Sequence, residues 1–90
     1  MEWKDKTSYS RGDKERIPRV LELNIEGLRI VIHRIIHCEG WYLTAYELNI
    51  NDFFLETEDV VEAKNKGLEV IVGRILKLER IKDIAITKIN

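Results

Sequence analysis

The sequence predicts an α+β domain: an N-terminal arm, a three-stranded antiparallel meander and one long C-terminal helix packed on one face of the sheet. Three observations predict this class. Residues 1–18 have no sustained period, residues 19–48 alternate apolar and polar side chains, and residues after 57 follow a helical period. Because consecutive strands are followed by one amphipathic helix, the helix should cover a single sheet face. The order of elements, β-β-β-α, is analogous to that of double-stranded-RNA-binding-like folds.

The N-terminal arm, residues 1–18, is a polar segment that ends at Pro18 and has no apolar run typical of a signal peptide. It nevertheless contains Trp3 and Tyr9, and large aromatic side chains usually have a surface to pack against. We therefore expect the arm to lie on a single α+β domain formed by residues 19–90.

The first predicted hairpin joins residues 19–25 to residues 28–37 through the two-residue turn Glu26-Gly27. Apolar side chains occupy alternate positions on both sides of this turn, as in half-buried strands. Pairing across two loop residues places all of these apolar side chains on one face, so turn and pattern agree on the register. The expected pairs are Ile25 with Leu28, Leu23 with Ile30, and Leu21 with Ile32.

A second Glu-Gly pair, Glu39-Gly40, predicts another two-residue turn and a third strand that begins at Trp41. This geometry pairs Ile36 with Leu43. Residues 49–52 break the alternation, and we expect residues 53–55 to anchor a connection into the core. The core face of the third strand should carry Trp41, Leu43 and Ala45, and its opposite face Tyr42, Thr44 and Tyr46.

The helix is predicted to begin after Thr57, which is a plausible N-cap, and to run to about Arg80. Gly67 interrupts it, and close packing against the sheet would explain a glycine there. Residues 81–90 fit either a continuation of the helix or a short strand. The apolar stripe of the helix consists of Val60, Val61, Lys64, Leu68, Ile71, Val72, Ile75 and Leu78.

Composition excludes several classes of protein. The formal net charge is -1 and the pI about 6.1, so no overall positive field attracts nucleic acid or anionic lipid. The single cysteine, Cys38, rules out an intramolecular disulfide and a thiolate zinc cluster. The apolar runs are too short to cross a bilayer. We expect a cytoplasmic protein with no membrane partner and no metal.

No constellation for catalysis is evident, so we expect that the chain is not an enzyme and needs no cofactor. His33 and His37 would lie roughly 13 Å apart on a strand that rises about 3.3 Å per residue, too far to share a metal ion. Cys38 follows His37 directly, and neighbouring strand residues point to opposite faces. The sequence also contains no glycine-rich phosphate loop and no zinc-finger spacing.

The outer sheet face is the strongest candidate for function because it is too apolar to lie bare in water. The arm could cover it with Trp3 and Tyr9, it could bind a protein partner or a second copy, or it could stack single-stranded nucleic acid. The acidic middle of the chain, with seven Asp/Glu and one Lys/Arg over residues 38–65, favours a protein partner. The candidate interaction face comprises Val31, His33, Ile35, His37, Tyr42 and Tyr46. The residues that would contact phosphate in the nucleic-acid alternative are Arg11, Lys14, Arg16, Arg19, Arg29 and Arg34.

The chain opens with the stretch Trp3-Lys4-Asp5-Lys6-Thr7-Ser8-Tyr9-Ser10, followed by Arg11-Gly12-Asp13-Lys14-Glu15-Arg16-Ile17-Pro18. This stretch resembles the opening of small uncharacterised proteins of Gram-positive bacteriophages and integrated mobile elements. The resemblance implies an accessory protein that works in the cytoplasm of a bacterial host, and it carries no activity, cofactor or site residue. Our leading hypothesis is therefore a non-enzymatic protein-interaction module. The alternative is a nucleic-acid-binding protein that uses the outer face and the basic arm.

Overall fold

The computed structural model describes residues 2–9 and 17–89, and over these residues the chain forms an antiparallel sheet and one long helix. The α+β class is confirmed, but the sheet has five strands in the order β1-β2-β3-β4-β5 where three were expected. In chain order the elements are β1 (Lys4–Asp5), β2 (Val20–Ile25), β3 (Leu28–His33), β4 (Tyr42–Ala45), the 3-10 turn η1 (Tyr46–Leu48), β5 (Ile50–Phe54) and α1 (Val60–Ile89).

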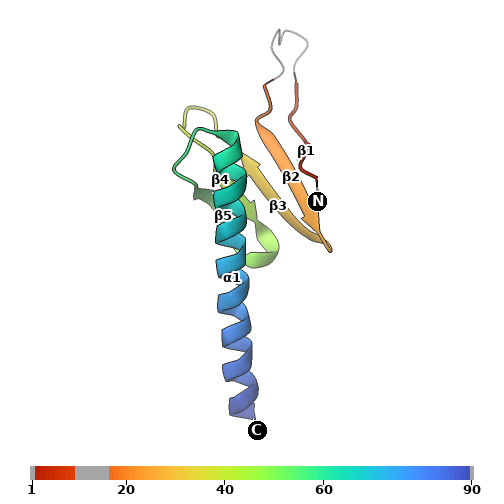
Figure 1. The fold of residues 1–90 in the computed structure, drawn as a ribbon, viewed down its shortest axis with the longest axis vertical. Helices are drawn as coiled ribbons and strands as arrows, with labels where there is room; N and C mark the ends of the chain where they lie inside the picture. The colour runs from red at the N-terminus through yellow and green to blue at the C-terminus, as the bar shows by residue number, and fades with distance from the viewer. Residues whose placement is uncertain (1, 10–16, 90) are drawn as a thin grey trace.

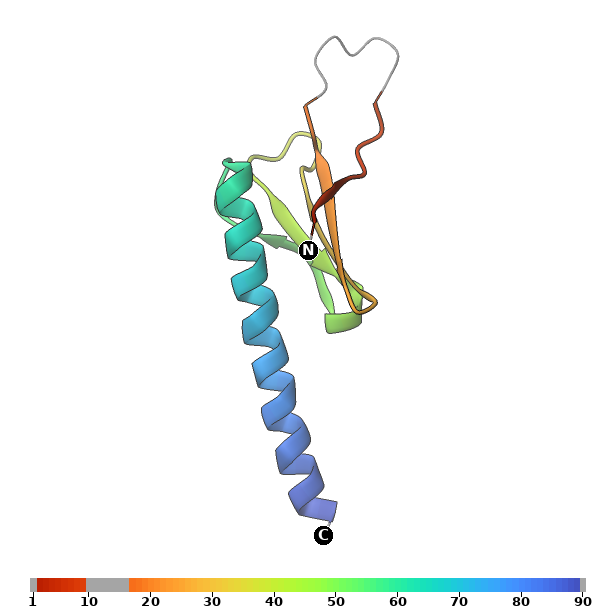
Figure 2. The same ribbon diagram turned by 45° about the vertical axis from the view of Figure 1, so that its right-hand side comes forward.

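The helix is much longer than the sheet that it covers. It has 30 residues and so spans about 45 Å, whereas the longest strands have six residues and span about 20 Å. The N-terminal half of α1 lies against one sheet face, and the C-terminal half extends past the end of the sheet (Figures 1 and 2). The described chain consequently has principal extents of 61 × 25 × 19 Å.

The hairpin of β2 and β3 has the predicted register. Ile25 pairs with Leu28, Leu23 with Ile30, and Leu21 with Ile32. The turn residues Glu26 and Gly27 have φ angles of 51° and 87°, which is the two-residue geometry that matches the twist of antiparallel strands. The Asn24 side-chain oxygen accepts a hydrogen bond from Gly27 N at 3.0 Å and closes the turn.

The expected end of the second strand and the expected second hairpin are both wrong. β3 ends at His33, not at His37, and Leu43 pairs with Ile32, not with Ile36. The reason is that the chain between β3 and β4 forms a wide loop, in which His37 and Gly40 both have positive φ angles of 65° and 80°. A side chain at Gly40 would place its Cβ 2.7 Å from the Phe54 ring, so the loop and the ring fit together without strain only over a glycine.

Residues 50–54, which were expected to be a connection, form the edge strand β5. The 3-10 turn η1 and Asn49, at a φ angle of 55°, reverse the chain after β4. The register between β4 and β5 then shifts between Leu43 and Ala45, and Asp52 inside the strand has a φ angle of 50°. This bulge removes the regular alternation that would have revealed the strand, and Asn and Asp tolerate such backbone better than most residues.

The described part of the N-terminal arm extends the sheet on the opposite edge. Lys4 and Asp5 pair with Glu22 and Leu21, and Trp3 packs against the hydrophobic core. The Thr7 hydroxyl oxygen accepts hydrogen bonds from the backbone N–H groups of Arg19 and Val20 at 2.7 and 3.0 Å. In the described residues, the arm thus lies beside β2 and does not cover the outer sheet face.

The core lies between the sheet and the N-terminal half of α1. A Cβ at Gly67 would be 3.3 Å from Ile32 Cγ2 and 3.6 Å from Leu43 Cδ1, so the helix packs closely on the sheet at this glycine, as its position in the sequence suggested. No helix in the described part of the chain is both long and apolar enough to cross a membrane. The buried apolar side chains are Leu21, Leu23, Ile30, Ile32, Trp41, Leu43, Ala45, Ile50, Leu55, Ala63 and Ile71.

The helix begins later and ends later than expected. Asp59, not Thr57, caps it, because the Asp59 carboxylate accepts a hydrogen bond from Val61 N at 3.1 Å. The Thr57 hydroxyl instead accepts one from Asp59 N at 3.1 Å. Residues 81–89 continue the helix, which decides between the two structures that their sequence allowed.

Candidate interaction surfaces

The outer sheet face, on the side away from α1, contains three of the six residues predicted for an interaction face. Val31 and His33 lie on β3 and Tyr42 lies on β4, and all three are partly buried. The Tyr42 ring is 6.3 Å from the His33 ring and 5.2 Å from the Phe54 ring. A row of three rings, His33, Tyr42 and Phe54, therefore crosses three adjacent strands. The sequence pattern missed Phe54 because β5 was not recognised as a strand.

The other three predicted residues lie outside the strands. Ile35 and His37 belong to the loop after β3, and Tyr46 begins η1, where it is 72% exposed. They were grouped with the outer face because the second strand was expected to continue to His37. The six residues therefore do not form one continuous row along the sheet.

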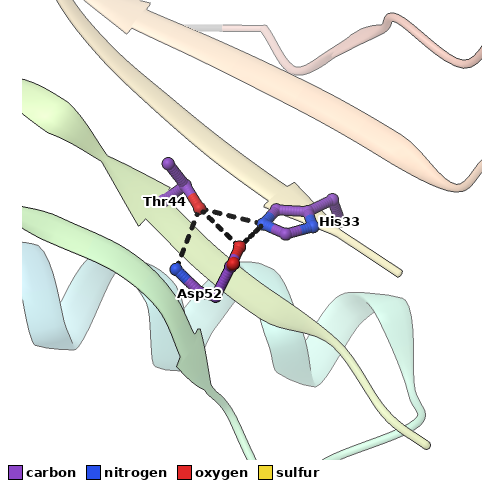
Figure 3. A network of polar contacts seen from close by, with 3 residues as sticks. All are labelled: His33, Thr44 and Asp52. Atoms are coloured by element: carbon purple, nitrogen blue, oxygen red, sulfur yellow. Dashed lines mark hydrogen bonds and ion pairs between the residues drawn. The ribbon is translucent and has the colours of Figure 1, made fainter. Parts of the chain in front are cut away.

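A polar network occupies the middle of the outer face (Figure 3). His33 Nε2 lies 2.9 Å from the Thr44 hydroxyl oxygen and 3.2 Å from a carboxylate oxygen of Asp52. The same Thr44 oxygen accepts a hydrogen bond from Asp52 N at 3.2 Å. Three strands, β3, β4 and β5, each supply one member, and the network holds the bulge at Asp52 in place.

This network does not have the geometry of a catalytic triad. In a triad the two histidine nitrogens divide the work, one contacting the nucleophile and the other the orienting carboxylate. Here one atom, His33 Nε2, makes both contacts, so the ring does not relay a proton from Thr44 to Asp52. Thr44 is also 94% buried, with 6% of its surface exposed. Among the described residues, no group of three or more His, Cys, Asp or Glu side chains has the spacing of a metal site.

Tyr42 differs electrostatically from an ordinary surface tyrosine. Burial raises the pKa of its phenol above the usual 10.0, and the neighbouring Cys38 thiol acts in the same direction. The phenol therefore keeps its proton, and can donate a hydrogen bond, up to a higher pH than an ordinary tyrosine does. Cys38 is itself exposed and free.

The basic residues predicted to contact phosphate are dispersed where they are described. The Arg29 guanidinium is paired with Glu22 on the outer face. Arg34 lies over the Trp41 ring at 5.7 Å from its centroid, and Arg19 contacts the arm through a hydrogen bond to the Ser8 carbonyl oxygen. The remaining candidates, Arg11, Lys14 and Arg16, lie outside the described residues.

A groove of about 680 Å³ lies between the end of the arm and the start of α1. Trp41 lines it and donates its indole N–H to the Glu58 carbonyl oxygen at 3.1 Å. The groove carries charges of both signs, among them Arg34, Asp59 and Lys64. Because the three basic and two acidic residues nearly cancel and much of the lining is apolar, the groove has no strong preference for an ionic ligand.

Half of the exposed large apolar side chains of the described chain lie on the C-terminal half of α1, residues 75–89, which we call the distal half. Burial on the helix ends at Ile71, and from Ile75 onward every residue of the distal half is exposed. The sequence offered a signal for this surface, because apolar residues continue at helical spacing after the predicted end at Arg80. The large apolar side chains exposed here are Ile75, Leu76, Leu78, Ile81, Ile84, Ile86 and Ile89.

Three comparisons with known proteins were made. A scan against protein-family models, a search of the curated proteins and a search of the solved structures each found no match for this chain. The function must therefore be argued from the surfaces described above.

Proposed function

We propose that this chain is a non-enzymatic protein-interaction module whose working surface is the distal half of α1. The likeness of its opening stretch to proteins of bacteriophages and mobile elements supports a role as an accessory protein in the cytoplasm of a bacterial host.

The observation that carries the proposal is an apolar helix segment with nothing packed on it. Seven large aliphatic side chains are exposed over fifteen residues, from 36% at Ile75 to 82% at Ile89. Five of them lie within about 80° of buried Ile71 around the helix, and the other two, Leu76 and Ile84, lie about 140° from it. Each such side chain stabilises a fold or complex by about 1.5–3 kcal/mol when it is fully buried. Soluble monomers rarely leave a contiguous surface of this kind uncovered, and such surfaces mark sites of interaction.

The length of the segment supports the same conclusion. An isolated helix of about 12–15 residues is marginally stable in water, since most helical stability in proteins comes from packing of an apolar face. The distal half has fifteen residues and receives no such packing from the sheet. A partner that covers the apolar face would supply the missing stabilisation.

Affinity capture with three baits tests this proposal. The wild-type chain and the variants Leu78→Asp and Leu76→Asp are immobilised and incubated with lysate of a Gram-positive host. Leu78 lies on the same side of the helix as buried Ile71, whereas Leu76 lies about 140° away from it at about 100° per residue. We expect wild type and Leu76→Asp to retain a partner that Leu78→Asp loses. Equal recovery by all three baits would refute the role of the distal half.

The nucleic-acid alternative is favoured by one observation, the row of rings formed by His33, Tyr42 and Phe54 on the outer face. Such rows can stack bases. The Asp52 carboxylate, however, lies 3.2 Å from His33 Nε2 in this row and would repel phosphate. If the alternative holds, a fluorescent single strand will bind with an affinity that falls steeply with salt and drops on Tyr42→Ala. Absence of binding at low salt would eliminate it.

A further inference from the structure

We propose that the distal half of α1 binds a second copy of this chain, and that the two helices run antiparallel. This inference rests on the proposed function and names the partner. The contact is made by one row of side chains on the helix, which we call the distal stripe: Ile75, Leu78, Lys82, Ala85 and Ile89.

The distal stripe continues the face of α1 that the sheet covers. At about 100° per residue, all five positions lie within about 40° of Ile71, which is buried against the sheet. Ile71 is the last residue of this face that is buried, and Arg74 still donates a hydrogen bond to the Leu48 carbonyl oxygen of η1 at 2.9 Å. The C-terminal half of the helix then runs past the sheet (Figures 1 and 2). A single helix face thus has one half covered by the sheet and one half uncovered.

The spacing within the stripe fits another helix in particular. The positions 71, 75, 78, 82, 85 and 89 are separated by alternating steps of four and three residues, which is the repeat that packs one helix against another. A second copy carries the same repeat over the same length. The surface is therefore complementary to itself, as a two-fold symmetric contact requires.

The position of the sheet selects the antiparallel orientation. Paired helices lie about 8–10 Å apart, so a partner helix on the distal stripe occupies the same layer as the sheet. In a parallel pair, both sheets would have to fit between the N-terminal halves of the two helices. In an antiparallel pair they lie at opposite ends of the dimer, and each distal half enters the space beyond the other copy's sheet.

Charge and size also favour this orientation. An antiparallel register that sets Leu78 opposite Ile89 sets Lys82 opposite Ala85, whose small side chain leaves room for the lysine stem. The two Lys82 side chains are then offset by three residues, about 4.5 Å along the helix axis. A parallel arrangement would instead bring the two Lys82 side chains together, which opposes association.

The contact spans about two heptads, which is short for a helix pair that associates without other contacts. We therefore expect a dimer that dissociates on dilution, with a dissociation constant in the micromolar range or above. The first test is sedimentation equilibrium over a concentration series for wild type, Leu78→Asp and the matched control Leu76→Asp.

Wild type and Leu76→Asp should shift from the mass of one 10.6 kDa chain toward twice that mass as concentration rises, and Leu78→Asp should remain monomeric. A far-ultraviolet circular dichroism spectrum of each variant verifies that the domain is folded. A wild-type chain that stays monomeric at millimolar concentration would overturn the inference, and so would a dimer that Leu78→Asp leaves intact.

Orientation is tested by cross-linking in a Cys38→Ser background. In the antiparallel register, residue 78 lies beside residue 89 of the second copy, whereas the two copies of residue 78 lie about 16 Å apart along the helix axis, as do the two copies of residue 89. A bismaleimide shorter than this joins only the mixed pair. A mixture of the Leu78→Cys and Ile89→Cys variants should cross-link, whereas each variant alone should not. Cross-linking of each variant with itself would show a parallel pair and contradict the antiparallel assignment.

The two proposals can fail separately. If wild type is monomeric but the lysate still yields a partner that Leu78→Asp loses, the self-association inference is wrong and the proposed function stands. If wild type dimerises through the distal stripe, the self-association inference is supported whatever the lysate contains. If the chain neither dimerises nor retains a partner, both are wrong.

Discussion

Substituting the two helix glycines separates the contact between α1 and the sheet from the intrinsic stability of the helix. Gly67 faces the sheet, where an added Cβ would lie 3.3 Å from Ile32 Cγ2, tighter than ordinary contact. Gly73 has no atom within 4 Å of an added Cβ. Alanine at either position gains about 0.8–1.0 kcal/mol of helix propensity relative to glycine. The two variants therefore differ only in what the methyl group meets.

We expect Gly73→Ala to raise the free energy of unfolding by about 0.8–1.0 kcal/mol. At Gly67 the same gain is offset by overpacking, which typically costs about 1–3 kcal/mol. Gly67→Ala should therefore range from neutral to about 2 kcal/mol less stable than wild type. In a chain of this size, 1 kcal/mol shifts Tm by about 4–8 °C, so the difference between the two variants is measurable.

Urea denaturation followed by circular dichroism at 222 nm gives both free energies at one protein concentration. Gly67→Val, with two further methyl groups toward Ile32 and Leu43, should be less stable than Gly67→Ala. The reasoning would be refuted if Gly67→Ala stabilised the protein as much as Gly73→Ala, because the helix would then not approach the sheet at Gly67.

Three further predictions concern charge and backbone. Hydrogen bonds from Thr7 and Tyr9 hold the pKa of Asp5 below its usual 3.8. The stability that these hydrogen bonds provide is therefore complete above pH 3.8 and is lost as the pH falls through the folded-state pKa. In urea titrations, Asp5→Asn should be less stable than wild type at pH 7, and the difference in free energy of unfolding should narrow below pH 3.8. The pKa of Tyr42 is raised, so the pH dependence is the opposite: the stability contributed by its neutral phenol is complete below pH 10.0 and is lost above the folded-state pKa. The absorbance change at 295 nm that Tyr42→Phe removes should have its midpoint above pH 10.0. A midpoint below pH 10.0 would contradict burial of the phenol. Gly40→Ala places a Cβ at a φ angle of 80° and 2.7 Å from the Phe54 ring, so it should cost about 1–3 kcal/mol of stability in the same urea assay, and a neutral effect would show that the loop closes differently.

The first hairpin was predictable from the sequence because two independent signals coincide. The Glu26-Gly27 turn and the alternation on both sides of it require the same register, and that register is the one observed. The helical period after residue 57 was equally clear. These elements depend on apolar periodicity and turn residues, both of which can be identified from neighbouring residues in the sequence.

The fifth strand and the end of β3 were not predictable because their signals are not periodic. Asp52 has positive φ inside β5, and the bulge opposite Leu43 and Ala45 breaks the alternation. The loop after β3 is stabilised by contacts that are distant in sequence, such as the hydrogen bond from Trp41 N to the Thr57 carbonyl oxygen at 2.9 Å. The residues beside Gly40 in the sequence give no signal that predicts this hydrogen bond.

The two candidate interaction surfaces, the outer sheet face and the distal half of α1, were only partly predictable. The outer face was correctly placed at Val31, His33 and Tyr42, but its extension to Ile35 and His37 depended on a strand that ends earlier. The distal half of α1 could have been found by comparing lengths. A helix of 30 residues is about twice as long as the strands of six residues below it, so half of its apolar stripe must lie beyond the sheet.

Amide hydrogen exchange of the wild-type chain, measured by mass spectrometry over a range of protein concentrations, tests whether a second copy covers the distal half of α1. The N-terminal half of α1 is held by the sheet, so its protection should be independent of concentration. The distal half has no such support in the monomer and gains it from the second copy. We predict that protection of residues 75–89 rises with concentration while that of residues 60–74 stays constant. Equal, concentration-independent protection of both halves would contradict self-association through the distal half of α1.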